Sequence, residues 1–158
     1  MARKGVKTKF LLVIILLVFL LSFYFIFHEF KYNTHYTNGA YATFLQGDNY
    51  LIGARVLFQS IKETKTKYPF VVMVTEEVTE VARQILTMEG AIIKEVTKVS
   101  NPKSDEIRYQ WVYTKLRIWE FVEYDRIVFL DADIIVRTNI DELFTRSLPP
   151  FCAVSDCW

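Results

Sequence analysis

Hydrophobic residues are distributed along the chain as one long uninterrupted run followed by several short ones. The long run covers residues 10–27 and contains no charged residue. Its length is close to the minimum for a helix that crosses a bilayer, and it exceeds the apolar region of most cleavable signal peptides. We therefore expect an uncleaved, membrane-spanning signal anchor at 10–27, preceded by a cytoplasmic tail at 1–9 and followed by a stem at 28–39.

The charges before this run predict its orientation. The tail is strongly basic, with Arg3, Lys4, Lys7 and Lys9 preceding the apolar residues. The positive-inside rule places such a flank in the cytoplasm. The sequence therefore predicts a single-pass type II membrane protein, anchored by its N-terminal helix, whose main part is luminal in a Golgi-like or ER-like compartment, or exoplasmic.

Beyond residue 39 the short hydrophobic runs alternate between two patterns. Continuous β-branched and aromatic runs, which predict buried strands, lie at 41–45, 68–74, 91–96 and 126–136, with a further strand-like run at 151–154. Apolar residues at helical spacing lie at 50–62, 78–88 and 111–124, with a short helical turn at 139–144. Strands that alternate with helices in this way pair in parallel, with helices on the faces of the sheet. We therefore expect an α/β fold over 40–158.

The fourth strand-like run contains two carboxylates. Asp131 and Asp133 follow the apolar residues 127–130 and are one residue apart. If that strand is buried on both faces, two neighbouring charges are costly unless a cation neutralises them. Carboxylate oxygens favour Mg²⁺ or Mn²⁺, which usually also hold substrate phosphates, and open α/β sheets bind ligands beyond the strand ends. The sequence predicts a metal and phosphate site here. The alternative is that both acids only cap the strand and begin a turn.

Two further segments could contribute to such a site. Lys115 lies in the predicted helix just before the acid-bearing strand and could reach a phosphate or a sugar hydroxyl. The alternative is a solvent-exposed helical lysine. The turn at 46–49 leads into the helix at 50–62, whose first backbone amides could hold a nucleotide phosphate or a base edge. The alternative there is an ordinary strand-to-helix turn.

Composition and charge change this picture little. Of the 19 Lys and Arg residues, four lie in the basic tail, which leaves 15 against 18 Asp and Glu and a net charge of −3. We find no basic patch in the sequence and expect no nucleic-acid partner. Cys152 and Cys157 could form a disulfide in an oxidising compartment or remain two thiols. His28 and His35 are the only histidines, and we interpret both as linker residues.

Several motifs in a fixed order resemble a known family. The segments at 41–54 (YATFLQGDNYLIGA), 113–136 (YTKLRIWEFVEYDRIVFLDADIIV) and 139–144 (NIDELF) are together similar to glycosyltransferase family 8. The resemblance is to the branch of glycogenin and the galactinol synthases, and the part KLRIWEFVEY is particularly similar to the latter. It extends from about residue 41 to residue 158, which is nearly the whole chain outside the predicted anchor and stem.

The resemblance implies a GT-A fold, a Rossmann-like α/β domain that binds a nucleotide sugar. It also implies an enzyme that moves a hexose from a UDP-sugar donor, with Mn²⁺ or Mg²⁺ as cofactor, to a sugar or polyol acceptor, with retention at the anomeric carbon. By this resemblance Asp131 and Asp133 are the metal ligands that bridge to the donor diphosphate, and Ala132 contributes backbone contact to the nucleotide. Lys115 matches a lysine that contacts the donor and has a catalytic role. The uridine-contacting positions of the first loop correspond to Phe44, Gln46, Gly47 and Tyr50.

The family completes its metal site with a histidine in a C-terminal motif that this sequence does not contain. We therefore expect the domain at 40–158 to be the N-terminal, donor-binding part of such an enzyme, incomplete at its C-terminus. A membrane-anchored remnant that binds a nucleotide sugar without turning it over is the main alternative. A phosphatase of the haloacid dehalogenase type also has two Asp after an apolar strand, but there the pair follows the first strand of the domain.

Overall fold

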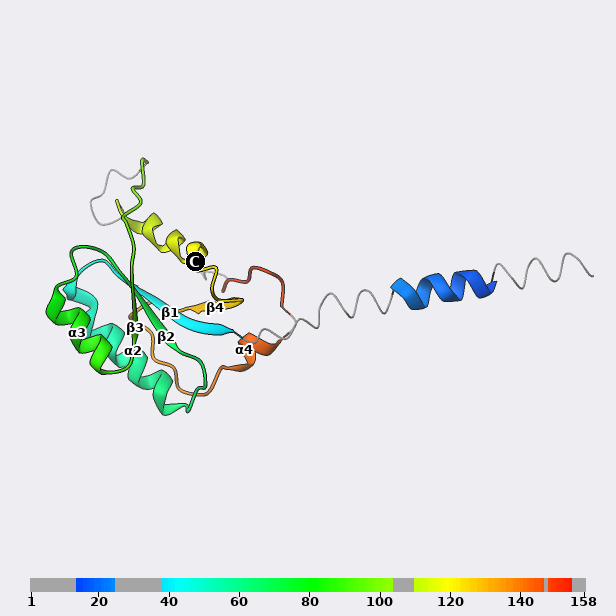
Figure 1. The fold of residues 1–158 in the computed structure, drawn as a ribbon, viewed down its shortest axis with the longest axis horizontal. Helices are drawn as coiled ribbons and strands as arrows, with labels where there is room; N and C mark the ends of the chain where they lie inside the picture. Colours follow the sequence, from blue (N-terminus) through cyan, green and yellow to red (C-terminus); the bar gives the residue numbers. More distant parts are fainter. Residues whose placement is uncertain (1–13, 25–37, 104–109, 147, 155–158) are drawn as a thin grey trace, which may run out of the picture. The chain divides into compact units, whose positions relative to one another are not determined.

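The computed structural model describes residues 14–24, 38–103, 110–146 and 148–154. The chain divides into two units, and one of them, Tyr36–Arg146, contains the sheet. Four strands form this sheet in the order β3-β2-β1-β4: β1 (Gly39–Leu45), β2 (Phe70–Val74), β3 (Ile92–Glu95) and β4 (Arg126–Phe129). All three pairings are parallel, so the carboxyl ends of the strands lie along one edge (Figure 1).

Helices cover both faces of the sheet. On one face lie α2 (Leu51–Glu63) and α3 (Glu80–Met88), and on the other lies the 3₁₀ helix η3 (Val112–Glu120), as Figure 1 shows. Two short elements complete the unit: the 3₁₀ turn η1 (Asp48–Tyr50) after β1 and the helix α4 (Glu142–Thr145) after β4. The predicted parallel α/β arrangement is therefore present.

The side chains of β1 alternate between the two faces. Tyr41 and Leu45 belong to the core cluster that includes α2 and α3, whereas Ala40 and Ala42 belong to a second cluster with Phe121. The small alanines let Ile118 and Phe121, at the end of η3, pack against the sheet. All five residues of β2 are buried, which explains why its sequence, FVVMV, does not alternate.

Local chemistry defines the ends of the helices. Thr79 caps α3, because its side chain accepts a hydrogen bond from the Ala82 N–H. Gly90, with a φ of 100°, allows the chain to turn after α3. The turn after α2 contains Lys65 with a φ of 58°, a left-handed conformation that is unfavourable for a residue with a Cβ.

Three predicted elements differ from the structure. The helix expected at 111–124 is a 3₁₀ helix that ends at Glu120. The strand expected at 126–136 ends at Phe129, because the chain turns where the Ile134 N–H donates to the Asp131 carbonyl at 3.2 Å. Residues 151–154 form no strand.

The membrane-spanning helix predicted at 10–27 is not supported. Within the described residues, the predicted segment contains helical structure at 14–24. No helix within the described residues is long and apolar enough to cross a membrane. The rest of the predicted anchor, at 10–13 and 25–27, lies outside the described residues, as do the tail at 1–9, His28, His35 and Cys157.

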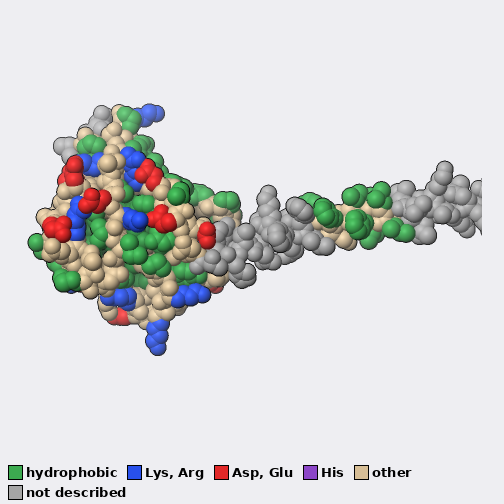
Figure 2. All heavy atoms as spheres, in the orientation of Figure 1, with side chains coloured by type: hydrophobic (Ala, Val, Ile, Leu, Met, Phe, Trp, Pro, Cys, Tyr) green, Lys and Arg blue, Asp and Glu red, His purple; other side chains and the backbone are tan. Residues whose placement is uncertain are grey.

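The surface of the sheet unit carries both signs of charge. On the face that Figure 2 displays, acidic and basic side chains are interspersed and neither sign forms a single patch. Ion pairs join several charged residues of this unit, such as Lys94 with Glu123 at 2.9 Å and Lys98 with Glu77 at 2.7 Å.

Candidate active site

The predicted site residues lie at the edge of the sheet formed by the carboxyl ends of the strands. The first loop (46–50) follows β1, the β2–α3 turn (75–79) follows β2, and the acid turn (131–134) follows β4. Strand β1 is central, with β2 on one side and β4 on the other, so its loop lies between the other two segments. From β1 the chain first adds β2 and β3 on one side and then crosses to add β4 on the other side. Open α/β sheets form ligand-binding crevices at such a point, beyond the carboxyl ends of the two strands where the direction changes.

The acid turn begins immediately after β4. The Leu130 N–H donates to the Ala42 carbonyl at 2.9 Å, which continues the pairing with β1 by one residue. Asp131 and Asp133 follow, and both are exposed. The expectation that they lie at the end of a strand buried on both faces is wrong, since the residues of β4 are only partly buried. Solvent lowers the cost of two nearby carboxylates, so their pairing does not by itself require a cation.

Lys115 and Asp131 are in contact. The Lys115 ammonium forms an ion pair with Asp131 Oδ1 and lies 5.7 Å from the centre of the Phe129 ring. Lys115 belongs to η3, which is tied to the segment after β3 by two hydrogen bonds: the buried Thr114 Oγ1 accepts from the Val99 N–H at 3.0 Å, and Arg117 Nε donates to the Thr97 carbonyl at 3.2 Å. These bonds orient η3 so that its lysine points to the acid turn.

The backbone of the acid turn lies against α2. Ala132 packs on the core cluster that includes α2 and α3, and its carbonyl oxygen approaches Gly53 in the first turn of α2. Further on, the Val136 N–H donates to Ser60 Oγ at 3.0 Å. Helix α2 therefore supports the main chain between and after the two acids, and both acidic residues are exposed to solvent.

The four residues predicted to contact uridine lie at the end of β1, which contains Phe44, and in the first loop, which contains the other three. Phe44 and Gln46 are partly buried, with Phe44 packed on the η3 side of the sheet, and Tyr50 is 62% exposed. Gly47 has extended backbone, with a φ of −167°, and a Cβ added there would meet no atom within 4 Å. Nothing in the fold requires glycine at this position, and the open space beside its backbone could receive a ligand.

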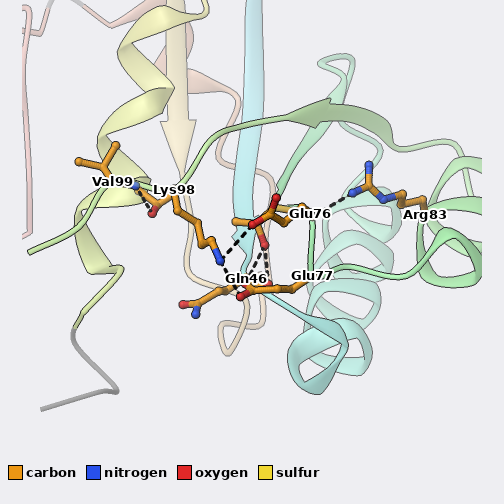
Figure 3. Close-up of polar contacts among 8 residues, drawn as sticks. Gln46, Glu76, Glu77, Arg83, Lys98 and Val99 are labelled. Atoms are coloured by element: carbon orange, nitrogen blue, oxygen red, sulfur yellow. Dashed lines mark hydrogen bonds and ion pairs between the residues drawn. The ribbon is translucent and has the colours of Figure 1, made fainter.

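A polar network that the sequence alone does not reveal joins the loops after β1, β2 and β3. Lys98, after β3, points to Glu76 and Glu77 after β2, and Gln46 lies beside them (Figure 3). The hydrogen bond from Lys98 lowers the pKa of Glu77, and the same bond raises the pKa of Lys98. In the sequence Glu76, Glu77 and Lys98 look like ordinary surface charges, and only the parallel pairing of the strands reveals that they meet.

The described residues offer two carboxylates for a metal ion at this edge. No group of three or more His, Cys, Asp or Glu within them is placed to hold a metal. Asp131 and Asp133 thus do not form an all-protein metal site. They do fit an ion such as Mg²⁺ or Mn²⁺ that is bound by one or two carboxylates and completed by water and substrate phosphates.

Comparisons with known proteins agree with this arrangement. The family model described as "Glycosyl transferase family 8" matches residues 42–158. Galactinol synthase 6 of Arabidopsis thaliana is 42% identical over 124 residues, covering 75% of this chain and 37% of the relative. Inositol phosphorylceramide glucuronosyltransferase 1 of the same species is 38% identical over 115 residues, covering 72% of this chain and 21% of the relative. The chain thus spans less than two fifths of the length of these relatives.

The fold also matches a solved structure. The crystal structure of an active site mutant of LgtC aligns with a TM-score of 0.51 at 21% sequence identity, covering 65% of this chain and 41% of the other. This likeness supports the GT-A type of parallel α/β sheet.

Proposed function

The chain belongs to glycosyltransferase family 8, and we propose that it binds a UDP-sugar donor and takes part in moving a hexose to a sugar or polyol acceptor. The observation that carries this proposal is the contact between Lys115 and Asp131 at the edge formed by the carboxyl ends of the strands. A cation and paired acids at one point are suited to a substrate that carries a diphosphate.

In the proposed complex, Asp131 and Asp133 would hold Mn²⁺ or Mg²⁺, which would neutralise charge on the donor diphosphate. Lys115 would leave Asp131 and contact the same diphosphate. Negative charge develops on the β-phosphate as UDP departs, and a positioned ammonium group stabilises it where it forms. Exchange of partners is feasible, because both side chains are substantially exposed, 40% for Lys115 and 52% for Asp131, and such surface pairs are weak.

The first loop would hold the nucleoside. Phe44, Gln46 and Tyr50 would contact the uridine, and the open backbone at Gly47 would allow the nucleotide to approach closely. The relatives named galactinol synthase favour a hexose donor and a polyol acceptor, and retention at the anomeric carbon follows from the family resemblance.

A second candidate function is binding of the nucleotide sugar without turnover. It is favoured by the finding that, within the described residues, no third protein ligand joins Asp131 and Asp133. Release of free UDP from UDP-galactose by the purified chain, with or without added polyol, would exclude this candidate.

Calorimetric titration of UDP into the full chain, with and without MnCl₂, tests the proposal. The key variant is Asp131→Asn combined with Asp133→Asn. Its matched control is Glu63→Gln combined with Glu142→Gln, which makes the same change in charge at the C-terminus of α2 and in α4. We expect Mn²⁺-dependent binding that the first pair abolishes and the control retains. A folded wild-type chain that binds no UDP would overturn the proposal.

A further inference from the structure

We propose that Thr75 and Thr79, at the two ends of the β2–α3 turn, are positioning residues that hold the first loop in the shape that receives the donor nucleotide. Neither side chain is assigned to contact the donor. They act through the backbone of Gln46 and the carboxylate of Asp48, on either side of Gly47. The inference rests on the proposed function, because it concerns the same nucleotide.

Thr75 anchors the first loop at Gln46. Its N–H donates to the Leu45 carbonyl at 3.2 Å, and its Oγ1 donates to the Gln46 carbonyl at 2.5 Å. Glu77 Oε2 is a second acceptor at 3.3 Å, but a hydroxyl has one proton and the Gln46 carbonyl is nearer. Thr75 is completely buried. Water therefore cannot replace the hydroxyl without local opening, and its removal would leave the Gln46 carbonyl without this bond.

Thr79 anchors the first loop at Asp48. The Thr79 N–H donates to Asp48 Oδ1 at 3.0 Å, and Thr79 Oγ1 donates to Asp48 Oδ2 at 2.7 Å. These two bonds lower the pKa of Asp48, which stays ionised at neutral pH. The same Oγ1 accepts from the Ala82 N–H at 3.3 Å, so one hydroxyl both caps α3 and holds the loop.

Arg83 fixes the β2–α3 turn that carries both threonines. Its Nη2 donates to the Thr75 carbonyl and its Nε to the Val78 carbonyl, each at 2.9 Å. The Arg83 side chain is only 14% exposed, so these bonds are largely shielded from water. The turn is thereby joined to the first turn of α3, and it provides a fixed support for the first loop.

The two anchors lie on either side of Gly47, whose backbone is open to a ligand. Gln46 and Asp48 are held, and Gly47 between them has space beside its backbone. If one anchor is lost, the loop populates other shapes, and the apparent affinity is the intrinsic affinity multiplied by the fraction of molecules that keep the competent shape. Loss of a single hydrogen-bonded anchor corresponds to binding that is roughly 3- to 10-fold weaker.

The test uses the full chain, UDP and MnCl₂, with affinity from calorimetry and folding from thermal melting. Thr75→Val removes the first anchor with little change in shape, and Thr75→Ser keeps the hydroxyl. Asp48→Ala removes the second anchor but leaves Thr79 free to cap α3, so it remains informative if Thr75→Val does not fold. The matched control is Thr87→Val, which removes a threonine hydroxyl bonded within α3 to the Arg83 carbonyl.

We expect Thr75→Val and Asp48→Ala to bind UDP roughly 3- to 10-fold more weakly than the wild type, in proteins that melt cooperatively. Thr75→Ser should recover most of the affinity lost in Thr75→Val, and Thr87→Val should bind like the wild type. Without ligand, amide hydrogen exchange of residues 46–50 should be faster in Asp48→Ala than in Thr87→Val.

Two results would overturn the inference alone: wild-type affinity in folded Asp48→Ala, or equal losses in Thr75→Val and Thr87→Val. A wild-type chain that fails to bind UDP would instead overturn the proposed function, and this inference with it.

Discussion

A Cβ added to Gly53 would lie 2.6 Å from the carbonyl oxygen of Ala132. The first turn of α2 thus touches the main chain between the two acids, so that only a residue without a side chain fits. We expect Gly53→Ala to push the acid turn away from α2. Alanine is favoured over glycine in a helix by about 1 kcal/mol, which offsets part of the strain. The melting temperature should therefore change little, whereas Mn²⁺-dependent UDP affinity should fall. An unchanged affinity would show that the acid turn adapts without loss.

Gly47→Ala provides the contrasting case. The backbone there is extended and the added Cβ meets no atom, so the variant should melt within about 1 °C of the wild type. UDP affinity should nevertheless fall, because the methyl group occupies the space into which the nucleotide is proposed to fit. Calorimetry and thermal melting on the same sample check both statements. Wild-type affinity would mean that the donor does not approach Gly47.

Lys115→Gln tests whether Lys115 contributes to donor binding and little to the stability of the fold. The ion pair with Asp131 is exposed, so its loss should cost less than about 1 kcal/mol in the free energy of unfolding. We expect weaker UDP binding, and slower release of UDP from UDP-galactose if the chain turns the donor over. Lys62→Gln, in the last turn of α2 where the lysine bonds to the Glu89 carbonyl, is the control for the loss of one positive charge. Equal effects in the two variants would contradict the role proposed for Lys115.

The lowered pKa of Asp141 should make the stability of the fold depend on pH. Burial acts to raise its pKa, but hydrogen bonds from Thr66 Oγ1 at 2.5 Å, Tyr41 Oη at 2.8 Å and the Lys67 N–H at 3.2 Å outweigh it, and the pKa is lowered. Because the folded pKa lies below the unfolded value of about 3.8, this carboxylate stabilises the fold above that pH. The stabilisation is lost as the pH falls through the folded pKa.

We therefore expect Asp141→Asn to lower the free energy of unfolding by about 1–3 kcal/mol at pH 7 and to flatten its decline in acid. Urea unfolding between pH 3 and pH 7 measures both quantities. The neighbouring Glu142→Gln, whose partner Arg146 is 3.7 Å away at the surface, should follow the wild-type curve. A parallel decline in Asp141→Asn and the wild type would contradict the assignment.

The left-handed backbone of Lys65 indicates that glycine at this position would stabilise the fold. Its φ of 58° is costly for any residue with a Cβ, and glycine removes this cost. Lys65→Gly should raise the free energy of unfolding by about 0.5–1 kcal/mol, as seen by chemical denaturation. Lys65→Ala separates the backbone effect from loss of the charge, since it keeps the Cβ and should give no such gain.

Continuous hydrophobic runs predict the sheet well, because buried parallel strands require them. The run at 68–74 contains β2, whose five residues are all buried. The run at 126–136 predicts too long a strand, since its last apolar residues leave the sheet and Val136 packs near α2. A hydrophobic pattern indicates that a residue is buried, but it does not indicate which element that residue packs against. The apolar run at 10–27 shows the same limit, because its composition suggested a membrane span that the described residues do not support.

Some features of the candidate site can likewise be predicted from the sequence, and others cannot. Asp131, Asp133 and Lys115 are candidates that the sequence itself offers, and the structure brings Lys115 into contact with Asp131. The bonds from Thr75 and Thr79 to the first loop cannot, because they join residues about 30 positions apart that resemble any other threonine. The sequence also does not indicate that the two acids are exposed, since their exposure depends on β4 being a short strand at the end of the sheet order.

The strand order has a consequence for the order in which parts of the chain fold. Tyr41 pairs with Phe70 in β2 and also with Val128 in β4, so the second pairing closes a loop about three times as long. Loop closure costs roughly 0.6 kcal/mol more for each doubling of length, and chains emerge from the ribosome N-terminus first. Strands β1 to β3 can therefore associate early, and β4 docks last. The acids become aligned with the first loop only at that final step. During refolding, nucleotide binding should consequently lag behind the recovery of secondary structure.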